Sequence, residues 1–158
     1  MDTRWKPSVT VAAIIERGGK FMLIEEQTSE GLKLNNPAGH LDPSESLIDA
    51  CAREALEETT HRFNPTALVG VYMSRMQRAA TGEDITYLRF AFCGELGDAV
   101  KGATLDTGIV RTLWMSPEEV RASVDRHRSP LLLRCMADYL AGQRSPLPLL
   151  YTDPTVLL

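Results

Sequence analysis

Three glutamates at helical spacing are the strongest chemical feature of the sequence. Glu54, Glu57 and Glu58 stand at i, i+3 and i+4, so a helix places their carboxylates in one sector. These carboxylates repel each other unless a cation joins them, and the one cation within the cluster is Arg53. Mg²⁺ prefers oxygen ligands, usually a few carboxylates and the phosphates of a substrate. The pattern therefore predicts a magnesium site, with Mn²⁺ as an alternative ion.

Two further positions support this interpretation. Arg53 lies one helical turn before Glu57, where its guanidinium can orient a ligand carboxylate. Gly39 ends the run Pro37-Ala38-Gly39, and without a β carbon it lets the backbone approach a metal closely. A solvated face of an amphipathic helix is the alternative, but such a face usually interleaves its glutamates with lysines.

The hydrophobic pattern predicts elements of both kinds around this site. A helix is expected over residues 46–59, where apolar residues recur at i, i+3 and i+4. The expected strands are residues 9–15, 20–26, 68–75, 85–96 and 109–115. The first two strands should form a hairpin, and residues 27–43 should form a loop. The sheet is expected to be mixed, or antiparallel in part.

Cap signals predict two more helices near the carboxyl end. Ser116 and Pro117 are typical of a helix start, and Ser129 should start another helix over residues 131–141. Beyond these helices, the prolines of the last stretch indicate an irregular arm over about residues 145–158. No internal repeat is visible.

Length and composition describe one compact domain over residues 1–158. The net charge of −4 provides no broad basic field, so no nucleic-acid partner is expected. No uncharged apolar run approaches the ~18 residues of a membrane span, so no membrane partner is expected. Cys51, Cys93 and Cys135 are odd in number and far apart, which favours free buried thiols in a reducing cytoplasm over a redox or zinc role.

The positions around the glutamates resemble the motif of the Nudix hydrolase family. That motif has a glycine, a glutamate six residues later, then Arg-Glu and Glu-Glu. In this sequence these residues are Gly39, Glu45, Arg53-Glu54 and Glu57-Glu58. Outside the motif the chain is similar to the NudJ-type nucleoside di- and triphosphate phosphatases at residues 6–12, 36–41, 87–90 and 128–131. The likeness covers most of the chain.

The resemblance implies an α/β fold, the Nudix α/β/α sandwich, with a mixed central sheet and a loop-helix-loop catalytic motif. It also implies magnesium-dependent attack of water on a diphosphate linkage. Under this resemblance Glu54, Glu57 and Glu58 are metal ligands or the general base, Glu45 is a supporting carboxylate, and Gly39 is a carbonyl ligand. Which glutamate takes the proton stays open.

The chain departs from the family pattern at the exit of the helix. Thr60 stands where the motif has a glycine, which normally serves a left-handed turn. A β-branched residue tolerates that conformation poorly. We therefore expect the exit to be closed in another way, or the turn to be extended, with the carboxylates unaffected.

Five residues outside the acidic cluster are candidates for substrate contacts. Arg75 and Arg89 lie on neighbouring predicted strands and would clamp a phosphate together, although each is as readily a solvated strand residue. Lys33, in the expected loop, is a weaker candidate. His40 follows the motif glycine, and Trp5 is placed to stack on an aromatic ring. A plain loop histidine and a tryptophan packed on the body are the ordinary alternatives.

The leading hypothesis is a magnesium-dependent hydrolase of small nucleotide or pyrophosphate substrates. These are nucleoside di- and triphosphates and thiamine-type pyrophosphates, cleaved with release of inorganic phosphate by a monomer or homodimer. Asp106 is considered as an extra acid reaching the metal from a loop, against an ordinary turn aspartate. The alternatives are a pyrophosphatase of ADP-ribose or another nucleoside diphosphate sugar, and a non-catalytic nucleotide-sensing domain. The complete set of motif carboxylates disfavours the last.

Overall fold

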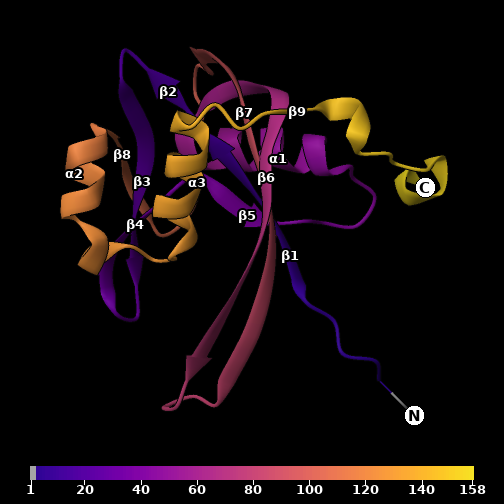
Figure 1. Ribbon diagram of the computed structural model, residues 1–158, viewed down its shortest axis with the longest axis horizontal. Coiled ribbons are helices and arrows are strands. Elements are labelled where there is room, and N and C mark those ends of the chain that lie inside the picture. The colour runs from indigo at the N-terminus through magenta and orange to yellow at the C-terminus, as the bar shows by residue number, and fades with distance from the viewer. Residues whose placement is uncertain (1–2) are drawn as a thin grey trace.

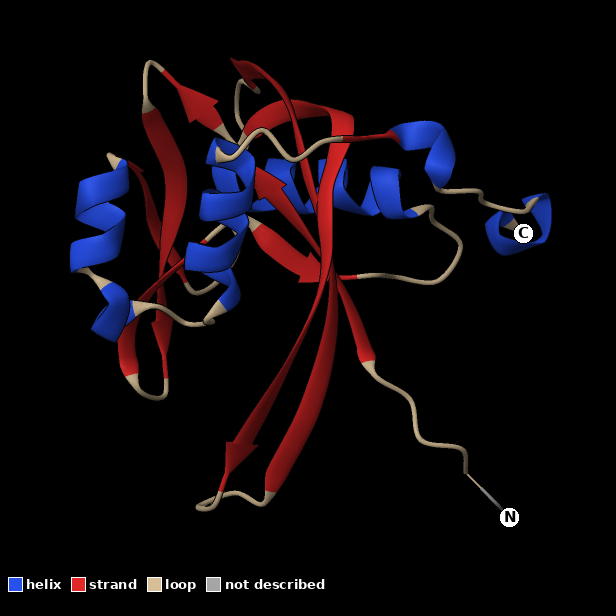
Figure 2. Ribbon diagram, viewed as in Figure 1, coloured by secondary structure: helices blue, strands red, loops and turns tan. Residues whose placement is uncertain are grey.

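The computed structural model describes residues 3–158, which form two β-sheets and three α-helices (Figures 1 and 2). The larger sheet has the strand order β5-β1-β7-β6-β9. β1 runs parallel to β7 and antiparallel to β5, so the expected mixed sheet is confirmed. Its strands are β1 (Ser8–Ile14), β5 (Ala38–His40), β6 (His61–Arg78), β7 (Glu83–Ala99) and β9 (Ser145–Pro146).

The smaller sheet is antiparallel. Its strands are β2 (Glu16–Arg17), β3 (Lys20–Thr28), β4 (Gly31–Asn35) and β8 (Ile109–Met115). Gly18 and Gly19 join β2 to β3 with φ values of 59° and 80°, the left-handed pair that a two-residue hairpin requires. The expected hairpin of residues 9–15 and 20–26 is therefore wrong in part. β1 belongs to the larger sheet, and the two-residue strand β2 forms the hairpin with β3 instead.

The sequence predicted a loop over residues 27–43, and this prediction is wrong because the segment contains β4 and β5. β5 has only three residues, Ala38–His40, and lacks the apolar alternation by which a strand is recognised. It pairs with β1 and places Gly39 opposite Val11. This short strand brings the glycine of the motif to the edge of the sheet.

α1 (Leu47–Thr59) follows the predicted helix closely. The hydroxyl oxygen of Ser46 accepts the N–H of Asp49 at 3.1 Å and caps its start. At its end Thr60 has φ 63°, and the Thr60 N–H donates to the carbonyl of Leu56 at 2.8 Å. The expectation of a different exit is therefore wrong. The left-handed exit is kept on a β-branched residue, which costs about 1–2 kcal/mol.

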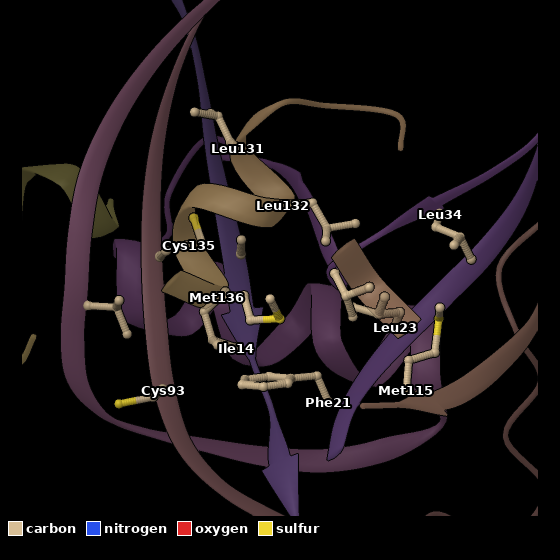
Figure 3. Packing of buried hydrophobic residues seen from close by; sticks show 14 residues of the cluster. Ile14, Phe21, Leu23, Leu34, Cys93, Met115, Leu131, Leu132, Cys135 and Met136 are labelled. Atoms are coloured by element: carbon tan, nitrogen blue, oxygen red, sulfur yellow. The ribbon is translucent and has the colours of Figure 1, made fainter. Parts of the chain in front are cut away.

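Apolar clusters on both faces of the larger sheet form the core. On one face α1 contributes Ala55 to a cluster with Phe92 of β7. On the other face α3 (Leu131–Leu140) contributes Met136 to a cluster with Ile14 of β1 (Figure 3). With helices on both sides of its sheet, the chain is an α/β sandwich, as expected.

The predicted cap of α2 (Pro117–Ala122) is present, whereas the N-cap of α3 is Pro130, and Ser129 precedes it. The Ser116 hydroxyl oxygen accepts the N–H of Glu119 at the start of α2, and that of Ser129 accepts the N–H of Leu131 at the start of α3. The arm after α3 is less irregular than predicted. It contains β9 and two 3₁₀ turns, over Leu147–Leu149 and Pro154–Leu157.

Two expectations from the sequence concern the cysteines and membrane-spanning helices. Cys51, Cys93 and Cys135 are free and buried, as predicted. Among the helices of residues 3–158, none combines the length and the apolar character that a bilayer crossing requires.

β6 and β7 form a long hairpin that extends beyond the rest of the molecule (Figure 1). Its tip is the polar segment 79–82, which the sequence indicated as the connection between two strands. Both strands are longer than predicted. One side of this hairpin faces the start of α3 and lines the pocket described below.

Candidate active site

Arg53 is the electrostatic centre of the acidic helix. Its Nε and Nη2 donate to the two oxygens of Glu45 at 3.0 and 2.8 Å. Its Nη1 donates to Oε1 of Glu54 at 3.0 Å and to Oε2 of Glu57 at 3.2 Å. Nη2 also donates to the carbonyl of His40 at 2.9 Å. Arg53 therefore ties the end of β5 to α1 and orients two of the three glutamates.

Glu45 remains charged and acts through Arg53. The hydrogen bond from Arg53 is the main cause that lowers the pKa of Glu45, and the N–H of Asp42 adds a hydrogen bond at 2.7 Å. A two-pronged pair of this kind fixes the direction of a guanidinium. The supporting role expected for Glu45 agrees with these contacts.

Glu58 and Glu54 have the opposite environment. Glu58 is 8% exposed, and its Oε1 accepts the N–H of Ala38 at 2.8 Å. Burial is the main cause that raises the pKa of Glu58 to about 8. Burial also raises the pKa of Glu54, although Arg53 acts in the other direction. Both ionised carboxylates are thus poorly stabilised by the protein, and a bound cation would stabilise them.

Two further acids lie close to this cluster. The N–H of Asp106 donates to the carbonyl of Glu57 at 3.0 Å, and the charge of Asp106 raises the pKa of both Glu54 and Glu58. Glu26 of β3 acts on the pKa of Glu58 in the same direction. Asp106 was considered from the sequence, but Glu26 was missed because it lies in a strand far from the motif.

The three helix glutamates suit a hard cation. In the part of the chain that the structure describes, each keeps one oxygen without a hydrogen-bond partner, namely Oε2 of Glu54, Oε1 of Glu57 and Oε2 of Glu58. Carboxylate oxygens are the donors that Mg²⁺ and Mn²⁺ prefer. Within residues 3–158 no three acidic, histidine or cysteine side chains already converge on one point. Arg53 holds Glu54 and Glu57 toward itself instead.

A pocket of about 800 Å³ opens beside these carboxylates. Gly39, Glu54 and Glu58 line one part of it, and Arg128 and Leu131 at the start of α3 line another. The hairpin adds residues from both strands, among them Ser74, Met76, Ile85, Tyr87 and Arg89. The volume is that of a site for a ligand of nucleotide size.

The two arginines expected to clamp a phosphate are not brought together. In the β6–β7 ladder Arg75 pairs with Thr86, whereas Arg89 pairs with Tyr72. Tyr72 and Arg75 are three positions apart on β6, so their ladder pairs face opposite sides of the sheet. Arg75 makes an exposed two-pronged pair with Asp84, at 2.8 and 2.7 Å. Both arginines are among the residues that line the pocket, but Arg89 is 4% exposed, whereas the guanidinium of Arg75 is paired with Asp84.

The other three substrate candidates are also dispersed. His40 lines the pocket, and its ring centroid is 6.4 Å from that of Tyr87 at an angle of 53°. Lys33 lies at a smaller neighbouring cavity and donates to the carbonyl of Asp125 at 3.3 Å. Trp5 is 66% exposed, ahead of β1, and is not among the residues that line the main pocket.

An acidic helix beside a polar pocket of nucleotide size defines, together with this fold, a hydrolase of phosphorylated small molecules. The family model of the NUDIX domain matches residues 4–135. Phosphatase NudJ of Escherichia coli K12 is 35% identical over 146 residues, which cover 92% of each chain. The chain belongs to the Nudix family. It is a hydrolase that acts on pyrophosphate bonds.

Solved structures agree with this assignment. A Nudix hydrolase from Nitrosomonas europaea is 49% identical, with a TM-score of 0.85 over 94% of this chain and 98% of the other. The MutT protein of Methanosarcina mazei Go1 is 24% identical, with a TM-score of 0.67 over 89% of this chain and 99% of the other. The second likeness concerns the fold alone.

Proposed function

We propose that this protein is a Mg²⁺-dependent phosphohydrolase, with Mn²⁺ as an alternative ion. Its substrates are nucleoside di- and triphosphates and thiamine-type pyrophosphates, from which it releases inorganic phosphate. The proposal rests on Glu54, Glu57 and Glu58 of one helix, each of which keeps one carboxylate oxygen without a hydrogen-bond partner among residues 3–158. Glu54 and Glu58 line a pocket of about 800 Å³. Similarity to a relative named a phosphatase supports the release of inorganic phosphate.

The residues of the chain have distinct tasks in this reaction. A divalent cation held by the glutamates would neutralise charge on the phosphoryl oxygens and make a water molecule more acidic. Glu45 fixes Arg53, and Arg53 fixes Glu54 and Glu57. Glu54, Glu57 and Glu58 each keep an oxygen without a hydrogen-bond partner among the described residues, so all three are candidates to receive the proton of the water.

We also propose that one domain carries the whole activity. The pocket draws its lining from residues as far apart as Thr10 and Leu131, so most of the chain is needed to build it. The three buried free thiols support a reducing compartment such as the cytoplasm.

A substrate panel tests the proposal. GTP, GDP, thiamine pyrophosphate and ADP-ribose are incubated with the protein and Mg²⁺, and inorganic phosphate and pyrophosphate are measured separately. We expect phosphate from the first three substrates, and no reaction in a chelator. Failure to hydrolyse any of these compounds with Mg²⁺ or Mn²⁺, or undiminished hydrolysis in the chelator, would reject the proposal.

A further inference from the structure

Arg89 is a buried cation in the wall of the main pocket, and its hydrogen-bond partners are neutral. It is 4% exposed. Its Nη1 donates to Oδ1 of Asn36 at 3.1 Å, and its Nη2 donates to Oδ1 of Asn35 at 3.2 Å. The thiol sulfur of Cys135 lies 4.0 Å from Nη1. These contacts orient the guanidinium without neutralising its charge.

The other arginines that line this pocket have carboxylate partners. The pairs are Arg53 with Glu45, Arg75 with Asp84, Arg78 with Glu83, and Arg128 with Glu26. Among the arginines of this lining, and within the described residues, Arg89 alone lacks such a partner. A buried charge without a counter-ion destabilises a protein. An anion bound at Arg89 would remove the free-energy cost of this unpaired buried charge.

Two segments hold the Arg89 side chain in place. Asn35 ends β4 and Asn36 follows it, and Cys135 belongs to α3. Both asparagines are buried, and Oδ1 of Asn35 also accepts the N–H of Asn36 at 2.9 Å. The donors are therefore fixed before a ligand arrives, which lowers the cost of binding one.

We propose that Arg89, oriented by Asn35 and Asn36, is an anion site that binds a phosphoryl group of the substrate. This inference rests on the proposed function for the identity of the anion. The pocket then uses charges of both signs: carboxylates for a cation at Glu54 and Glu58, and a guanidinium for phosphoryl oxygens at Arg89. Arg75 has no part in this site.

The substitution Asn36→Asp tests the proposal directly. It changes the shape of the side chain very little, yet it gives Arg89 the carboxylate partner that it lacks. We expect this variant to fold with an unchanged or higher thermal midpoint and to lose anion binding. Asn64→Asp makes the same chemical change at an exposed position of β6 and serves as the matched control. Arg89→Gln, which removes the charge and keeps a donor, is the second variant.

The readout is the thermal midpoint in EDTA, with about 50 mM inorganic phosphate compared with potassium chloride of equal ionic strength. Wild type and Asn64→Asp should gain about 3 °C or more with phosphate, and the other two variants about 1 °C or less. With GTP and Mg²⁺, Asn36→Asp should raise KM at least about tenfold. No phosphate-dependent gain in wild type, or an equal gain in Asn36→Asp, would overturn the anion site.

The outcomes also separate this inference from the proposed function. Phosphate binding in EDTA requires neither metal nor hydrolysis. If phosphate stabilises the wild type but no diphosphate is hydrolysed with Mg²⁺, the proposed function fails and the anion site stands. If hydrolysis is found without phosphate binding at Arg89, the anion site fails and the proposed function stands.

Discussion

The carboxylate of Glu54 fills the space that a side chain at Gly39 would occupy. A β carbon placed on residue 39 would lie 2.0 Å from Cδ of Glu54 and 2.1 Å from its Oε1, far closer than atoms approach. Gly39 has no positive φ, so this position requires glycine for space and not for backbone freedom. Gly39 and Glu54, the first of the three helix glutamates, are therefore one packed unit.

Gly39→Ala should reduce kcat by at least about a hundredfold, because the added methyl group must displace the Glu54 carboxylate from its place beside Arg53. The fold should survive, since Glu54 is a side chain that can move. Activity with Mg²⁺ and the thermal midpoint are measured together. Gly97→Ala is the control, because a β carbon there would lie 3.3 Å from the carbonyl of Arg62, outside the site. Full activity of Gly39→Ala would show that Glu54 does not need this position.

Glu57→Gln and Glu58→Gln should each lower turnover by at least about a hundredfold without unfolding the protein, since each removes a charged oxygen donor. Circular dichroism should be unchanged. Glu118→Gln, on the exposed part of α2, is the control and should behave as wild type. Near-normal activity in both site variants would reject the carboxylate site.

The stability of the metal-free protein should fall as the pH rises through the range from about 4.5 to 8. Burial raises the pKa of Glu58 to about 8, above the value of 4.5 that it has when exposed. The folded state therefore binds a proton more tightly than the unfolded state, and the resulting stabilisation is lost as the pH rises through the folded pKa. Denaturant unfolding in EDTA at several pH values measures the slope. Glu58→Gln should flatten it, and an equal slope in that variant would assign the effect to other groups.

Thr60→Gly should leave the activity unchanged and stabilise the protein by up to about 1 kcal/mol, because glycine adopts φ 63° without the cost of a β-branched side chain. The left-handed exit is already present, so the substitution has no turn to rebuild. The free energy of unfolding and kcat are measured. A marked loss of activity would mean that the threonine has a task at the end of α1.

Much of the fold could be predicted from the sequence because helix caps and apolar spacing favour the same elements as the tertiary packing. The cap at Ser46 and the helical spacing of the apolar residues after it predicted α1 correctly. The cap at Ser116 predicted α2, and the apolar strand pattern of residues 109–115 predicted β8. β5 was not readable, since its three residues become a strand only through pairing with β1. Thr60 was misjudged because the surrounding structure, including a hydrogen bond from the Val100 N–H to its carbonyl, overrides its own preference.

The acidic cluster was predictable for a local reason, whereas the surroundings of Arg89 in the pocket were not. Glu54, Glu57 and Glu58 belong to one helix, so their spacing alone brings them together. From the sequence, Arg89 was a candidate for a phosphate clamp with Arg75, with a solvated strand residue as the alternative. The middle of β7, where Arg89 lies, is buried on both faces, however, because α1 covers one side of the sheet and α3 the other. Its asparagine partners come from residues 35 and 36, and no spacing rule connects these positions.

Nucleoside triphosphates should release inorganic phosphate in steps, not pyrophosphate at once. An anion site at Arg89 can hold an inner phosphate while the terminal phosphorus lies at the glutamates, which directs water to the outermost linkage. GTP should then give GDP followed by GMP, and thiamine pyrophosphate should give the monophosphate and phosphate. Reaction in ¹⁸O-labelled water, followed by mass analysis of the products, identifies the phosphorus that is attacked. Pyrophosphate as the first product from GTP, or much faster hydrolysis of ADP-ribose than of any triphosphate, would reject this substrate assignment and leave the metal site intact.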